Sequence, residues 1–110
     1  LSELDCSGLD FTDANFTEAK CSRANFAYAD FTEANFSGAN FSGANFEYAN
    51  FTDVNFSEAN FTEAKCTRAH FTRVNFAMVN FTRVNFSEAK CTRVNLTGDN
   101  LVNVFVHKEG

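Results

Sequence analysis

Cysteine and histidine are the side chains best suited to chemistry in this 110-residue chain, which has four cysteines and two histidines. A thiolate can act as a nucleophile or bind zinc, and an imidazole can act as a general base. The chain has no C-x-x-C pair and no Cys/His group with the spacing of a zinc site. His70 and His107 have no Ser, Cys or carboxylate that the sequence pattern would hold beside them. Because phosphate-loop and nucleophile motifs are also missing, the sequence predicts no enzyme, no cofactor and no metal site.

The cysteines instead belong to a repeat of five residues. Every fifth position from 1 to 101 is Phe, Cys or Leu, and most are Phe. The cysteines at this central position are Cys6, Cys21, Cys66 and Cys91. We interpret them as buried free thiols that pack like small hydrophobic side chains, and we expect no disulfide framework. Reduced cysteines favour a cytoplasmic location. No signal or transit peptide is visible, and the start at Leu1 rather than Met suits the removal of upstream residues.

A period of five excludes both a helix and a long strand. Five helical residues turn through about 500°, so the central residues would spiral around a helix, and an odd period alternates the faces of a strand. Each unit has Ala or Val two positions before the centre, usually Asn or Asp one before it, and Ser or Thr one after it. An apolar-polar-apolar triplet is typical of a short strand, and the two residues that follow suit a solvated corner. The sequence therefore predicts an all-β solenoid.

The period alone does not give the number of sides in each coil. The unit Ala-[Asn/Asp]-[Phe/Leu]-[Ser/Thr]-X resembles the signature of the pentapeptide-repeat family over roughly 1–104. This resemblance implies a right-handed quadrilateral β-helix, in which four units make one square turn. It also implies that the central residue and the small residue two positions before it point inward. On this basis we expect about five coils and buried central residues from Phe11 to Phe86.

The regular pattern changes near the C-terminus, where a charged residue falls on an inward position and an aromatic one on an outward position. We expect the solenoid to occupy 1–104 and a C-terminal tail to occupy 105–110. An exposed aromatic side chain beside a strand edge suits a two-fold contact. Val102 and Phe105 are therefore candidates for self-association, as a weak homodimer through the C-terminal end.

The outer surface varies most at the second corner position, two residues after each centre, so we expect recognition to depend on it. Residues that differ by 20 in number should stack on one another. One such column changes from acidic to basic, and another places two tyrosines one coil apart. The candidate interaction surface consists of Asp13, Glu33, Asp53, Arg73 and Arg93 in the first column, and of Tyr28 and Tyr48 in the second. Opposite charges on adjacent coils predict exposed ion pairs for Glu3/Arg23, Glu63/Arg83 and Arg68/Glu88.

A further column, one position before the centre, contains only asparagine. Its members are Asn15, Asn35, Asn55, Asn75 and Asn95. We interpret them structurally, as amides that hydrogen-bond along the stack and at the corners.

Charge and hydropathy restrict the function. The net charge of −5 disfavours direct nucleic-acid binding, and no apolar stretch approaches the length of a membrane span. Residues 1–60 contain ten acids and two bases, net −8, whereas residues 61–110 contain four acids and seven bases, net +3.

The sequence predicts a non-enzymatic structural or protein-interaction module with an unknown protein partner. The resemblance leaves a second hypothesis, because some family members, including quinolone-resistance proteins, mimic DNA and bind DNA gyrase, a type II topoisomerase. The acidic first half supports this alternative and the basic second half opposes it.

Overall fold

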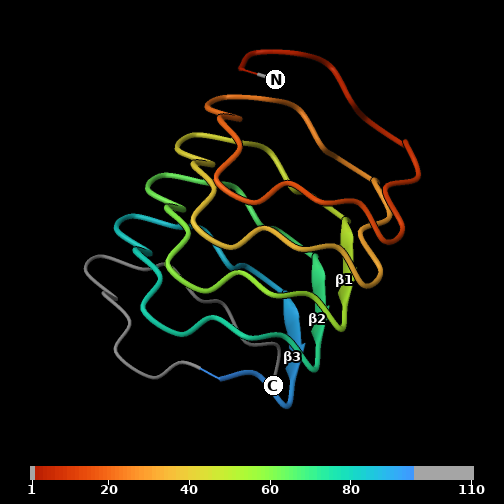
Figure 1. Ribbon diagram of the computed structural model, residues 1–110, viewed down its shortest axis with the longest axis vertical. Coiled ribbons are helices and arrows are strands. Elements are labelled where there is room, and N and C mark those ends of the chain that lie inside the picture. The colour runs from red at the N-terminus through yellow and green to blue at the C-terminus, as the bar shows by residue number, and fades with distance from the viewer. Residues whose placement is uncertain (1, 96–110) are drawn as a thin grey trace.

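The chain winds into a stack of four-sided coils, which the computed structural model describes over residues 2–95. Figure 1 shows the coils lying one below another from the N-terminus downward. Three strands lie side by side on one side of the stack: β1 (Asn50–Thr52), β2 (His70–Thr72) and β3 (Lys90–Thr92). They are parallel and follow the order β1-β2-β3, with Phe51 opposite Phe71. Among the described residues there is no helix.

Each coil contains twenty residues, which is four units of five. The strand register pairs Asn50 with His70, and isolated parallel bridges repeat the same offset on the other sides. The bridges Asp5–Asn25, Asp10–Asp30, Asn15–Asn35 and Lys20–Asn40 represent the four sides in turn. The predicted all-β quadrilateral solenoid is therefore confirmed.

Backbone hydrogen bonds join each coil to the coils above and below it. The N–H of Phe31 donates to the carbonyl of Asn50 at 2.8 Å, and the N–H of Asn50 donates to the carbonyl of Ala29 at 3.0 Å. At the corner, the N–H of Glu33 donates to the carbonyl of Thr52 at 2.8 Å. Because these bonds recur at each unit, interior coils have their polar backbone groups paired on both sides.

The corners are tight turns that require a left-handed residue. At one of them, the N–H of Ala14 donates to the carbonyl of Phe11 at 3.0 Å, and Asp13 has a φ of 62°. A positive φ at the third residue is the conformation of a type II turn. The same position has a φ between 53° and 70° throughout the described part, although glycine occupies it only at Gly8, Gly38 and Gly43. Most corners therefore carry a side chain in a conformation that L-residues rarely adopt.

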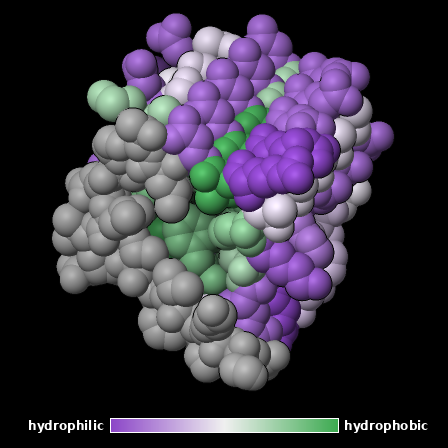
Figure 2. Space-filling model, turned by 90° about the horizontal axis from the view of Figure 1, so that it is seen from below, coloured by the Kyte–Doolittle hydropathy of each residue, from purple (hydrophilic) through white to green (hydrophobic). Residues whose placement is uncertain are grey.

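Phenylalanine rings fill the interior in vertical stacks. The stacks on adjacent sides meet edge to face: Phe31 and Phe36 have centroids 4.9 Å apart and an interplanar angle of 72°. Figure 2, seen from below, shows apolar residues in the middle of the stack and hydrophilic residues outside them. The predicted burial of the central residues is confirmed from Cys21 to Phe81. It is wrong for Phe11, Phe16 and Phe86, which are only half-buried because they belong to the first and last described coils.

The four cysteines are free thiols, as predicted. Cys6, Cys21 and Cys66 are buried, in agreement with the interpretation that they replace Phe in the interior. Cys91 is exposed, so the prediction of burial is wrong there. It lies in β3, the edge strand of the described sheet, and another described coil covers it on one side only. The predictions for Val102, Phe105 and the boundary at 104 lie outside the described residues.

Candidate interaction surface

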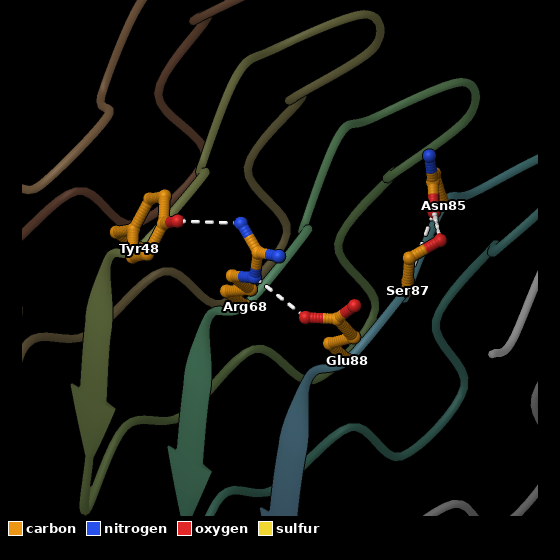
Figure 3. Close-up of polar contacts among 5 residues, drawn as sticks. All are labelled: Tyr48, Arg68, Asn85, Ser87 and Glu88. Atoms are coloured by element: carbon orange, nitrogen blue, oxygen red, sulfur yellow. Dashed lines mark hydrogen bonds and ion pairs between the residues drawn. The ribbon is translucent and has the colours of Figure 1, made fainter. Parts of the chain in front are cut away.

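The two candidate tyrosines start an ordered column of side chains. The rings of Tyr28 and Tyr48 stack with centroids 4.8 Å apart and an interplanar angle of 5°. On the next coil, Arg68 donates from Nη1 to the Tyr48 hydroxyl at 2.6 Å and from Nε to Glu88 at 2.6 Å (Figure 3). Its Cζ lies 5.7 Å from the centroid of the Tyr48 ring. Hydrogen bonds to Glu88 and Tyr48 raise the pKa of Arg68, so its charge is permanent. We call Tyr28, Tyr48, Arg68 and Glu88 the tyrosine column.

The second set of candidates, Asp13, Glu33, Asp53, Arg73 and Arg93, forms the charge column. All five of its side chains are exposed. Its centre is a two-pronged ion pair, in which Arg73 donates from Nε to Oδ1 of Asp53 at 2.7 Å and from Nη2 to Oδ2 at 3.0 Å. The hydrogen bond from Arg73 lowers the pKa of Asp53, and Asp53 raises that of Arg73. The column therefore keeps two acids and one base outside this pair.

The two columns border the same side of the solenoid. Tyr48 lies just before β1 and Asp53 just after it, so each strand on this side separates the two columns. Between them runs a central row of outward side chains one position before each centre, joined by parallel pairing from coil to coil. The members of the central row are Asp10, Asp30, Asn50, His70 and Lys90. We call this side, with its central row and both columns, the graded face.

Charge changes sign along the graded face. The central row is acidic in its first two coils, neutral at Asn50, and carries His70 and Lys90 in its last two. The charge column changes in the same direction. The row of asparagines on the adjacent side has no charged member, so the graded face carries part of the charge asymmetry between the two halves of the sequence and that adjacent row carries none. Reading each column alone missed the central row, although stepping through the sequence by twenty residues would have found it.

The acids of the central row also close the corners next to them. Oδ1 of Asp10 accepts from the Thr12 N–H at 2.9 Å and from its hydroxyl at 2.6 Å. These bonds lower the pKa of Asp10, so its carboxylate is charged at neutral pH. Asparagines use the same geometry, as at Asn35, whose Oδ1 accepts from the Ser37 N–H at 3.0 Å. The predicted bonding of the asparagines at the corners is therefore confirmed.

Bonding along the asparagine stack is less regular than at the corners. One side-chain pair within the described residues joins Nδ2 of Asn95 to Oδ1 of Asn75 at 3.4 Å. The asparagines therefore stabilise the corners more than they link the coils.

The three predicted ion pairs between adjacent coils are confirmed. Their shortest N–O distances are 2.7 Å for Arg23–Glu3, 2.6 Å for Arg68–Glu88 and 3.5 Å for Arg83–Glu63.

Within residues 2–95, no three His, Cys, Asp or Glu side chains gather in a way that could hold a metal ion. In the same range no helix has the length and apolar character of a membrane span. The chemistry that this surface offers is recognition through charge, hydrogen bonds and aromatic rings.

Comparison with known proteins agrees with this architecture. A family model described as "Pentapeptide repeats" matches eight copies, over residues 1–27, 19–57, 39–76 and 59–101. No curated protein matches the chain. A crystal structure of a pentapeptide repeat protein from the thylakoid lumen of Arabidopsis thaliana is 23% identical with a TM-score of 0.69, covering 92% of this chain and 67% of that chain.

Two further solved structures are similar over most of this chain. Rfr23 from the cyanobacterium Cyanothece 51142 is 16% identical with a TM-score of 0.50, and the match covers 94% of this chain and 88% of that chain. Trypsin-treated QnrB1, a plasmid-mediated fluoroquinolone resistance protein, is 20% identical over 93% of this chain and 60% of that chain. Its TM-score of 0.38 is too low to support an argument from shape. At these identities the similarities establish the fold alone.

Proposed function

Since the chain belongs to the pentapeptide-repeat family, we propose that it is a non-enzymatic protein-interaction module whose binding surface is the graded face. The observation that carries this proposal is the tyrosine column, in which two exposed rings and an arginine are already ordered by their neighbours. Tyr28 is 65% exposed and Tyr48 is 39% exposed, although both are large hydrophobic residues. Tyr and Arg are the residue types that most often dominate the energy of protein interfaces.

Order before binding reduces the entropy that a partner has to overcome. Stacking restricts both tyrosine rings, and Arg68 is held by hydrogen bonds at Nη1 and Nε. Because these side chains are positioned in the free protein, a partner does not have to immobilise them. The charged groups of the same face would fix the orientation of the partner and increase its association rate.

The proposal is tested by capture of partners from the native host. The immobilised parent protein is compared with a variant carrying Tyr28→Ser and Tyr48→Ser, and with a control carrying Met78→Ser. Met78 is 63% exposed at a corner away from the graded face, so the control also removes an exposed apolar side chain. We expect a partner that the parent and the Met78 variant retain and the tyrosine variant loses. Equal capture by all three proteins would show that the graded face is not the binding surface.

A second candidate function is DNA mimicry toward DNA gyrase. The acids of the first two coils favour it, because Asp10, Asp13, Asp30 and Glu33 place negative charge on one surface. The bases on later coils of the same face oppose it. Gyrase supercoiling is assayed with and without a fluoroquinolone in the presence of the protein. Inhibition of supercoiling, or protection from the drug, would support this alternative, and an unchanged assay would exclude it.

A further inference from the structure

The graded face is complementary to itself when one copy is inverted. Its central row is antisymmetric about Asn50: Asp10 and Lys90 lie two coils away from it in opposite directions, and Asp30 and His70 lie one coil away. The charge column has opposite charges at its two ends, Asp13 and Arg93, and its middle member, Asp53, is paired with Arg73. When a second copy is inverted against such a surface, the acidic half of each copy faces the basic half of the other.

We propose that the graded face binds a second copy of this chain, with the two stacks antiparallel, about a two-fold axis that runs parallel to the strands at the level of β1. This inference rests on the proposed function, since it names the partner of the same face. The axis brings each row against the same row of the second copy in reversed order. Asp10 then faces Lys90 of the second copy, and Asp13 faces its Arg93. A two-fold interface forms each of these pairs twice.

The middle of the face also matches under this operation. Asp30 faces His70, whose ring N–H can donate to a carboxylate, and Tyr28 faces Arg68, an arrangement suited to a cation–π contact. Asp53 faces its own copy, but each Asp53 is already neutralised by the two hydrogen bonds from Arg73. No unneutralised acid of the central row or charge column therefore meets another acid.

The opposite orientation is disfavoured by the same charges. An axis parallel to the stack would place Asp10 against Asp10 and Lys90 against Lys90 of the second copy. Like charges in these positions repel, so the gradient selects the antiparallel arrangement. The gradient thus fixes the orientation of the second copy as well as attracting it.

The size of the face determines the strength of the dimer. Five stacked segments about 4.8 Å apart, on a side on the order of 10 Å wide, offer only a few hundred Å² per protomer. Stable interfaces bury about 800 Å² per partner, so this dimer is weak and forms at high micromolar to millimolar concentration. Because exposed charges supply much of its complementarity, added salt should dissociate it.

Sedimentation velocity on the full chain, at high concentration and in low and high salt, tests the proposal through a charge swap. One variant carries Asp10→Lys with Asp13→Arg, and the other carries Lys90→Asp with Arg93→Glu. All four of these side chains are exposed, and lysine at 20 and 65 and arginine at 73 already occupy equivalent positions of the repeat. We expect the parent to dimerise in low salt, each variant alone to be monomeric, and the 1:1 mixture to form a heterodimer.

Two further proteins control for net charge and for folding. Glu18→Lys with Glu58→Arg makes the same change in net charge at another exposed corner and should leave the dimer intact. Asp10→Asn with Asp13→Asn removes both charges, while the amide introduced at position 10 retains an oxygen acceptor for the corner. This variant should weaken the dimer on the order of tenfold. Far-UV spectra establish that each variant is folded.

Three outcomes would overturn the inference: a monomeric parent, a mixture that does not associate, or a dimer that only Phe105→Lys abolishes. If the parent is monomeric but captures another protein through Tyr28 and Tyr48, the inference fails and the proposed function stands. If the parent dimerises but captures no other protein through Tyr28 and Tyr48, the experiments support a second copy as the partner of this face and no other protein.

Discussion

The ring of Phe31 lies parallel to the ring of Phe51, twenty residues later, with centroids 5.1 Å apart and an interplanar angle of 3°. Phe71 continues the stack at 4.9 Å and 4°. Each ring of this stack also contacts rings on the adjacent sides edge to face, as Phe51 does with Phe56 at 5.0 Å. Such ring pairs stabilise proteins beyond the area that they bury. The interior is therefore a connected lattice of rings rather than four separate stacks.

Removal of one ring from this lattice should be costly. Phe51 is fully buried between Phe31 and Phe71, so Phe51→Ala leaves a cavity that neighbouring coils cannot fill. We expect a loss of about 3–5 kcal/mol in the free energy of unfolding, measured by chemical denaturation. Phe11→Ala, in the half-buried first coil, is the matched control and should cost less. Equal losses at the two positions would contradict the view that stacking on both sides stabilises the interior.

The corners should reject β-branched side chains even where they are fully solvated. Met78 has a φ of 62° and is 63% exposed, and none of the positive-φ residues in the described part is β-branched. Because a β-branched residue is strained at positive φ, Met78→Val should lower the free energy of unfolding by about 1 kcal/mol or more. Met78→Leu has similar hydrophobicity without the branch at Cβ and serves as the control. Equal stability of the two variants, by thermal or chemical unfolding, would show that the corner tolerates the strain.

The cysteines should differ in reactivity according to depth. Desolvation raises the pKa of both the Cys66 and the Cys91 thiol, but Cys66 is fully buried whereas Cys91 is exposed to the reagent. Alkylation followed by mass spectrometry, near the pKa of about 8.5 of a free cysteine, should label Cys91 quickly and Cys66 only after unfolding. Rapid labelling of Cys66 in the folded protein would mean that the interior opens locally.

Acid should weaken the pair between Asp53 and Arg73. Arg73 lowers the pKa of Asp53 in the folded protein, so the pair stabilises the fold at pH values above the unfolded pKa of about 3.9. This contribution disappears as the pH falls through the lower folded pKa. The melting temperature of the parent should therefore fall more steeply below about pH 4 than that of an Asp53→Asn variant. Parallel curves for the two proteins would show that the exposed pair contributes nothing measurable.

The sequence predicts the architecture well because the repeat assigns each residue an inward or outward direction. Phe51 and Asn50 follow directly from their place in the unit, and so does the pairing of Arg68 with Glu88. The place of a residue in its unit does not by itself show how completely it is covered. Cys91 has the same place in its unit as Phe51, yet it is exposed, and within the described residues a neighbouring coil covers it on one side only.

The candidate surface was predicted only in part for a similar reason. Tyr28, Tyr48 and Asp53 follow from variation at the corners. Their arrangement around one face is a relation between neighbouring columns, which appears only when the two corners of a side are considered together with the row between them. The central row, with Asp10 and Lys90 at its ends, occupies the position one before each centre, where only the asparagine column was considered.

The constant offset of twenty residues also has a consequence for how the chain folds. Asn50 lies opposite Asp30 and His70, each twenty positions away, and the other described bridges have the same offset. No contact between distant parts of the sequence has to form first, so the solenoid can nucleate on any two adjacent coils and grow by adding one coil at a time. Opening by the reverse path would start in the outermost coils, and in the first described coil Leu4 and Leu9 are half exposed. Amide protons around Phe51 should therefore exchange with solvent most slowly, and the rate should increase toward both ends of the stack.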